Sequence, residues 1–233
     1  MPGAVRFIRT ARHLVVMATI ATEEKRCAVC GKTSVQGFVA DAGREGSADL
    51  DLRPPPDQRE TIQHWVQECP HCGYCGLSLE EPTEGAAEVM ASDGYRALRE
   101  KPNPELVVRL LCASTLLEHA DRWVEATETS LWAAWAADDA GAEEDAVRAR
   151  RRTLDLLDEV RRRGEHYIDN PEAETLVMVD VARRAGEFER AAALLDELGG
   201  ADDPRFAAIV AFQRDRVAAR DTGRYTVAEA SRA

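Results

Sequence analysis

The sequence has no long hydrophobic run and no recognisable catalytic signature. No stretch approaches the ~20 consecutive apolar residues that a membrane-spanning helix requires. The chain also has no His-Glu-x-x-His pair, no nucleophile elbow and no glycine-rich phosphate-binding loop. We therefore expect a protein that is not an enzyme and that has no membrane partner.

Positive charge is also in short supply. The 30 Lys and Arg residues are outnumbered by 42 Asp and Glu residues, which gives a net charge of −12. This balance argues against a nucleic-acid binder that works by neutralising phosphates. Basic residues nevertheless gather around the first cysteine pair, so a nucleic-acid-associated zinc ribbon remains an alternative: Arg6, Arg9, Arg12, Lys25, Arg26 and Lys32.

Four of the six cysteines occur in two Cys-x-x-Cys-Gly sequences. Together these pairs supply the four thiolates that a closed tetrahedral zinc site requires. We predict one structural Zn²⁺ ion bound by Cys27, Cys30, Cys69 and Cys72. A single iron ion is the alternative, because tetrahedral sulfur coordination does not by itself discriminate between the two metals. Metal-binding cysteines favour a reducing compartment, so we expect a cytoplasmic location.

The second pair carries further thiol chemistry. Its sequence, Cys-Pro-His-Cys, matches the dithiol of strong disulfide oxidants, but those need a thioredoxin-like βαβ context that is missing here. Cys75 lies three residues after Cys72 as a candidate accessory thiol. A thiol-based redox or metal sensor that uses the Cys69–Cys75 cluster is therefore another hypothesis. We expect Cys112, which lies in an apolar helical pattern, to be a small core residue.

The N-terminal third shows strand patterns around the cysteines. Alternating residues predict short strands at 35–39 and 48–53, and the triproline at 54–56 ends the second. We favour a further strand at 61–68 that leads into the second cysteine pair. The resulting zinc-ribbon-like domain, over 23–80, is too small to bury much core, so metal binding would supply most of its folding energy.

The first residues have the outline of a signal peptide, because three arginines precede the apolar run 14–21. The run is short and no small-x-small cleavage site follows it. We therefore interpret residues 1–22 as a flexible N-terminus, and whether Met1 or Met17 is the true start stays open.

From Glu84 the hydrophobic period becomes helical. Helices are expected after Pro104, at about 122–139, from Gly141 to about 166, after Asn170 as N-cap, after Gly186 and at 204–220. A corner motif repeats within them: Asp121 and Gly186 are each followed by an aromatic residue two positions later and by Ala five positions later. This pattern resembles the core of a tetratricopeptide hairpin, but the echo is degenerate and its spacing is not 34 residues, so we expect hairpins that are tetratricopeptide-like and no more.

The predicted fold is thus α+β and predominantly α, with a small N-terminal β zinc ribbon followed by antiparallel tetratricopeptide-like hairpins. The helical domain is expected to span 84–221, and a flexible tail is expected at 222–233.

Three separated segments resemble one family. They are the run Asp49–Pro54, the run Trp65–Tyr74, and the helix with Trp132-Ala-Ala-Trp135 followed by Asp138-Asp139. Together they are similar to the bacterial domain-of-unknown-function family numbered 2225, whose members join a zinc-ribbon-like N-terminus to tetratricopeptide-like helices. The resemblance covers roughly residues 27–220 and is sharpest at the cysteine pairs. It implies this fold but no activity, and Cys75 departs from the small residue expected there.

The sequence therefore predicts a non-catalytic zinc-binding adaptor that presents helical repeats to a protein or peptide partner. The partner-binding candidates are aromatic and basic residues of the helical part, namely Trp123, Trp132, Trp135, Arg151 and Arg162.

Overall fold

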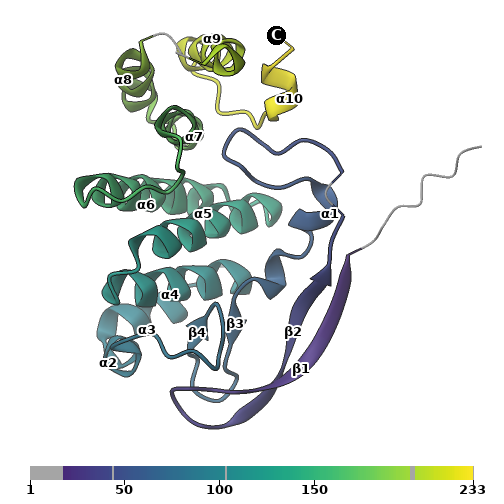
Figure 1. The fold of residues 1–233 in the computed structure, drawn as a ribbon. Coiled ribbons are helices and arrows are strands. Elements are labelled where there is room, and N and C mark those ends of the chain that lie inside the picture. Colours follow the sequence, from purple (N-terminus) through teal and green to yellow (C-terminus); the bar gives the residue numbers. More distant parts are fainter. Residues whose placement is uncertain (1–17, 44, 103, 200–202, 233) are drawn as a thin grey trace, which may run out of the picture.

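We describe a computed structural model of the 233-residue chain, which covers residues 18–43, 45–102, 104–199 and 203–232. The molecule is predominantly helical, with its small β layer at one end of the helical stack (Figure 1). The N-terminal arginines and both candidate start methionines lie outside the described residues.

The β layer consists of two separate antiparallel pairs. Strands β1 (Thr19–Arg26) and β2 (Thr33–Asp41) form a hairpin, and β3 (Gln67–Glu68) pairs with β4 (Cys75–Gly76). The strand predicted at 35–39 is confirmed as the middle of β2. The hairpin includes residues 19–22, which we expected to belong to a flexible N-terminus. In the structure, residues 19–26 pair with 33–41 along their length.

The strand predicted at 48–53 is wrong. Asp49 makes an isolated bridge with Thr226, and the chain then turns, with the Leu52 N–H donating to the Asp49 carbonyl at 2.9 Å. The acidic and basic side chains of this segment are buried in ion pairs instead of facing solvent. The alternation of charged and apolar residues therefore reflects these buried ion pairs and not a strand with one solvent-facing side.

Most of the strand expected at 61–68 is also replaced by helical turns. Helix α1 (Pro56–Arg59) and the 3₁₀ turn η1 (Ile62–His64) precede β3. The Thr61 hydroxyl donates to the Gln58 carbonyl at 2.7 Å and accepts from the Trp65 indole N–H at 2.8 Å. These two bonds favour a compact turn over an extended strand.

The remaining chain is helical, as predicted. Helices α4, α5 and α6 stack one above another, with the C-terminal helices at the end far from the β layer (Figure 1). The bounds are α2 (Ala86–Ala91), α3 (Asp93–Arg99), α4 (Glu105–His119), α5 (Trp123–Asp139), α6 (Glu143–Arg162), α7 (Pro171–Arg184), α8 (Phe188–Leu198), α9 (Pro204–Ala218) and α10 (Val227–Ala230).

Three helix–helix corners share one geometry. Asp121, Gly141 and Gly186 have φ angles of 57°, 67° and 76°. At each corner the following residue donates its N–H to a carbonyl five residues back, at 2.9 Å. The alanine five positions after each corner residue is buried, which lets the helices approach closely. The sequence echo therefore marks a repeated helix-capping turn, whereas tetratricopeptide-like repeats stay a prediction.

The C-terminal segment does not match the expected frayed tail over residues 222–232. A capping box formed by Thr226 and Glu229 starts α10. The Leu50 N–H donates to the Tyr225 carbonyl, and the Val227 N–H donates to the Ala48 carbonyl, both at 2.9 Å. This backbone pairing holds the segment against the 48–50 loop. One cluster of buried residues accordingly extends from Cys27 to Ala230.

Candidate metal centre

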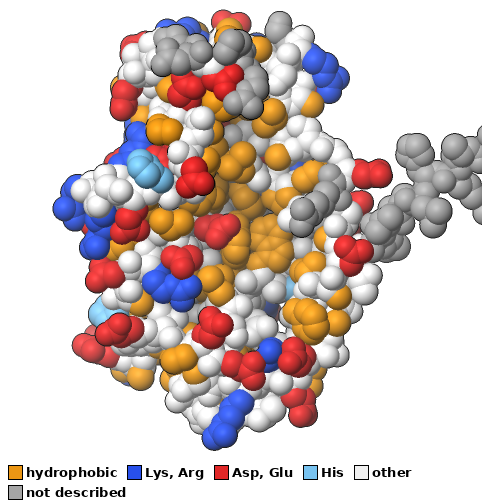
Figure 2. All heavy atoms as spheres, viewed as in Figure 1, with side chains coloured by type: hydrophobic (Ala, Val, Ile, Leu, Met, Phe, Trp, Pro, Cys, Tyr) orange, Lys and Arg blue, Asp and Glu red, His pale blue; other side chains and the backbone are white. Residues whose placement is uncertain are grey.

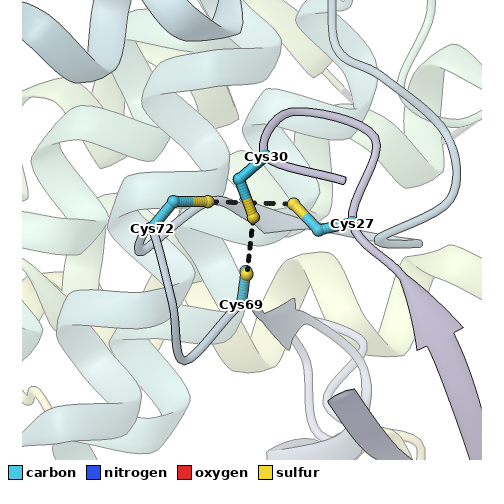
Figure 3. A group of neighbouring side chains, drawn as sticks. All are labelled: Cys27, Cys30, Cys69 and Cys72. Atoms are coloured by element: carbon cyan, nitrogen blue, oxygen red, sulfur yellow. Dashed lines mark hydrogen bonds between the residues drawn. The ribbon is translucent and has the colours of Figure 1, made fainter. Parts of the chain in front are cut away.

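The four predicted ligands converge on one point. Cys27 and Cys30 lie in the turn after β1, and Cys69 and Cys72 lie in the turn between β3 and β4, with all four thiols directed at one another (Figure 3). Their Sγ atoms all lie within 4.8 Å of one another. The Sγ atoms of Cys27 and Cys72 are 3.8 Å apart, and those of Cys30 and Cys69 are 3.6 Å apart.

These distances fit a shared tetrahedral metal ion. Zn–S bonds of about 2.3 Å at tetrahedral angles place sulfur atoms about 3.8 Å apart. A disulfide would bring them to about 2.05 Å, and all six cysteines have free thiols. Both short contacts join one turn to the other. The arrangement can therefore hold one metal ion between the turns, with all four protein ligands in place.

The two turns have matching backbone hydrogen bonds. In the first, the Gly31 N–H donates to the Cys27 carbonyl at 2.8 Å; in the second, the Gly73 N–H donates to the Cys69 carbonyl at 2.9 Å. Both glycines have positive φ, +72° and +76°, which a side chain would resist. Each Cys-x-x-Cys-Gly sequence thus folds into the same tight turn around its two thiols.

The thiols differ in their ease of ionisation. Burial opposes ionisation of Cys69, but hydrogen bonds from the backbone N–H groups of His71 and Cys72 outweigh it and lower the pKa of Cys69 to about 7. Burial raises the pKa of Cys72 to about 12 and also raises that of Cys27. A divalent cation among the four sulfurs would stabilise the thiolate form of all of them.

Further contacts attach the centre to the rest of the protein. The Ala28 N–H donates to the Leu79 carbonyl at 2.8 Å, which ties the first turn to the chain beyond the second. The Glu68 carboxylate pairs with Arg99 of α3 at 2.9 Å and with Arg109 of α4 at 3.4 Å. The centre is therefore anchored directly to two helices.

The candidate accessory thiol is buried. Cys75 lies in β4, and its Sγ donates to the Gly73 carbonyl at 3.5 Å. A hydrogen bond with Cys112 and burial raise the pKa of Cys75 well above its usual value. Such a thiol is a poor nucleophile. Cys112 is buried in α4, as expected of a core residue. Among the described residues, the four-cysteine group is the only cluster that could hold a metal ion.

The five partner-binding candidates do not form one surface. Trp123 is partly exposed beneath the Arg163 guanidinium, which lies 4.5 Å from the ring centroid. Arg151 and Arg162 are exposed on α6 and pair with Glu187 at 3.1 Å and with Glu159 at 2.5 Å. Trp132 is partly exposed and Trp135 is buried, and both line a pocket beside the 48–58 segment.

The three segments that carry the family resemblance meet at this pocket. Asp51 accepts a hydrogen bond from the Trp135 indole at 2.9 Å, and Arg53 pairs with Asp139. Trp65 packs edge-on against Trp132, with ring centroids 4.9 Å apart. The resemblance singled out these segments, but no spacing rule predicts their contact. Glu128 and Tyr167 also line the pocket and were not predicted, because they lie in ordinary helical and loop sequence.

Comparison with models of known protein families, with curated proteins and with solved structures found no match. The resemblance to the family numbered 2225 therefore stays a prediction. Within the part of the chain that the structure describes, every helix is too short or too polar to cross a membrane.

Proposed function

We propose that the protein is a non-catalytic zinc-binding adaptor, in which one structural Zn²⁺ fixes the β layer against the helical body. The observation that carries the metal assignment is the meeting of four sulfurs at tetrahedral spacing. Zinc is favoured over iron because nothing else in the sequence indicates electron transfer. When bound, the metal would supply folding energy. All four coordination positions would be filled by protein ligands, so no position would be left for water or substrate, and the role would be structural and not catalytic.

Metal analysis of the purified protein tests this assignment. We expect about one zinc per chain in the wild type, and loss of the metal in Cys69→Ser. Cys75→Ser is the matched control, because it removes a neighbouring thiol outside the group of four and should retain the zinc. Iron in place of zinc, less than one metal per chain, or equal loss in both variants would contradict the proposal.

Chelation tests the role of the metal in folding. Structural zinc contributes roughly 10–16 kcal/mol in small zinc-finger modules, so its removal should unfold the β layer. Amide exchange should show loss of protection in β1 to β4. Far-UV circular dichroism should show that much of the helical signal is retained. An unchanged exchange pattern in the metal-free protein would contradict a structural role.

The adaptor role is supported by the stacked helices, which offer exposed charged surface such as Arg151 and Arg162 on α6. A pull-down from the native host with metal-loaded protein tests it. A partner retained by the wild type and lost in Arg151→Glu/Arg162→Glu would place the contact on α6. Equal recovery by both proteins would contradict that placement, and recovery of no protein would contradict the adaptor role.

A further inference from the structure

A pocket of about 450 Å³ lies where the 48–58 segment, Trp65, α5 and the chain before α7 meet. Figure 2 shows apolar side chains gathered at the centre of this face, beside the end of α5, with acidic side chains at their border. Its lining includes Leu52, Trp65, Glu128, Trp132, Trp135 and Tyr167. The volume lies in the range of about 300–1,000 Å³ typical of small-molecule sites.

Three tryptophans line this pocket, of which Trp65 and Trp132 are partly exposed and Trp135 is buried. The Trp65 ring lies 4.9 Å from that of Trp132 with an interplanar angle of 69°, and 6.4 Å from that of Trp135 with an angle of 84°. Because the rings are steeply inclined to one another, a group bound in the pocket can contact aromatic surfaces of different orientation. A cation placed over such faces is attracted by the ring quadrupoles.

Hydrogen bonds fix two of these rings in place. The Trp65 indole donates to the Thr61 hydroxyl at 2.8 Å, and the Trp135 indole donates to Asp51 at 2.9 Å. The Asp51 charge is compensated by Arg184, whose Nη1 lies 2.7 Å away. The walls are therefore preorganised, and the polar groups that orient these two rings are already satisfied within the protein.

Glu128 is the charged group of the lining. Unlike the neighbouring Glu125, which pairs with Arg122 at 2.9 Å, the Glu128 carboxylate makes no hydrogen bond or ion pair with the described residues. Burial and the Glu125 charge raise the pKa of Glu128. Burial, and after it the Glu128 charge, raises the pKa of Tyr167. An unpaired carboxylate beside aromatic faces is complementary to a positive charge.

Leu52, which also lines the pocket, has an unusual backbone conformation. It is 43% exposed and has a φ of +66°, which is rare for a residue other than glycine. Its N–H bond to Asp49 holds this turn closed. Backbone strain of this kind persists where the surrounding structure imposes it, and ligand sites are common locations.

We propose that this pocket binds a small organic cation through a quaternary ammonium group. The two partly exposed rings, Trp65 and Trp132, supply cation–π attraction, and the Glu128 carboxylate supplies the counter-charge. The proposal is independent of the zinc centre, because none of the four cysteines lines the pocket.

Choline is the probe, and its control is the neutral isostere in which carbon replaces the nitrogen. Three of the four tryptophans line the pocket, and the fourth is Trp123. In the Trp123→Phe variant all tryptophan fluorescence therefore comes from residues of the pocket. We expect saturable quenching by choline in the millimolar range, confirmed by calorimetry, and much weaker binding of the isostere. Equal binding of both compounds, or binding of neither, would overturn the proposal.

Two variants locate the site. Glu128→Gln should weaken choline binding roughly 2- to 30-fold, whereas Glu125→Gln, the same change at a carboxylate that already has a partner, should leave it within about twofold. Trp132→Leu keeps an apolar residue but removes one aromatic wall, and should weaken choline without affecting the isostere. Melting curves establish that each variant is folded. Unchanged affinity in folded Glu128→Gln would overturn the assignment.

A methylated lysine side chain carries the same head group, so a neutral peptide containing trimethyl-lysine forms a second arm. Choline binding as tight as or tighter than peptide binding supports a small-molecule ligand. Much tighter binding of the peptide would overturn the proposal that the ligand is a small molecule.

Discussion

Gly73 lies where the second cysteine turn contacts helix α3. A Cβ atom at this position would come within 2.7 Å of the Arg99 guanidinium, which is held by Glu68 at 2.9 Å and by the Gly73 carbonyl at 3.0 Å. At Gly31, by contrast, the nearest atom outside the turn would be 3.7 Å away. The two turns match in backbone but differ in surroundings.

We therefore expect Gly73→Ala to destabilise the protein more than Gly31→Ala. Left-handed strain should cost about 1–2 kcal/mol in both variants. Displacing the Arg99 bonds should add about 1 kcal/mol or more at Gly73 only. Urea unfolding of the zinc-loaded proteins measures both values. Equal destabilisation would show that Arg99 moves away freely.

His64 should make stability depend on pH. Burial and the nearby Arg109 charge lower the pKa of His64 below its ordinary 6.5. As the pH falls through 6.5, the unfolded chain takes up this proton before the folded one does, so the free energy of unfolding decreases. The His64 contribution is complete above this range and declines below it.

The comparison that isolates this effect is wild type against His64→Gln, both saturated with zinc, between about pH 7.5 and 5.5. Protonation of the cysteine ligands affects both proteins, so the difference between them reports His64. We expect a steeper loss of stability in the wild type; parallel curves would contradict the assignment.

At the scale of elements, the helix corners depend on single residues with positive φ. Gly186 has a φ of +76°, and a Cβ atom added there would meet no other atom within 4 Å, so the cost of an alanine is purely conformational. Gly94 lies within α3 and also has open space, but its backbone is helical.

The same substitution should therefore have opposite effects. Gly186→Ala should destabilise by about 1–2 kcal/mol, whereas Gly94→Ala should stabilise by about 0.5–1 kcal/mol because alanine loses less entropy in a helix. Thermal unfolding monitored at 222 nm, a wavelength that follows helix content, measures both. Destabilisation by both changes would mean that packing, not backbone conformation, controls these positions.

The elements also show how far a pattern in the sequence predicts structure. The helical period predicted α5, and the sequence Asn-Pro-Glu predicted the Asn170 cap of α7, because both features depend on interactions within a few residues. Alternation at 48–53 predicted a strand and was wrong, because Asp51 pairs with Arg184, 133 positions away. Cysteine spacing predicted the metal group, since the ligand type itself carries the signal. Glu128 carries no such signal.

At the scale of the molecule, Asp51 joins the loop between β2 and α1 to helices α5 and α7. Its buried carboxylate accepts from Arg184 at 2.7 Å and from the Trp135 indole at 2.9 Å. Asp51→Ala would leave both donors without this partner in a buried site, so we expect destabilisation by about 3 kcal/mol or more.

Arg162→Ala is the control for this change, because it removes an exposed pair with Glu159 that should be worth about 0–1 kcal/mol. Denaturant unfolding compares the two variants. Similar small effects in both would show that water compensates the buried donors left by Asp51→Ala.

The pairing of the 47–50 loop with the C-terminal segment imposes an order on biosynthesis. The Ala228 N–H bonds to the Ser47 hydroxyl across 181 positions in the sequence. At about 5–20 residues per second, the ribosome delivers the second partner on the order of 10–40 s after the first. All four metal ligands, the last of which is Cys72, have emerged long before then. A nascent chain can therefore acquire its metal early, whereas the 47–50 loop keeps an unpaired edge until Ala228 and its neighbours have been synthesised.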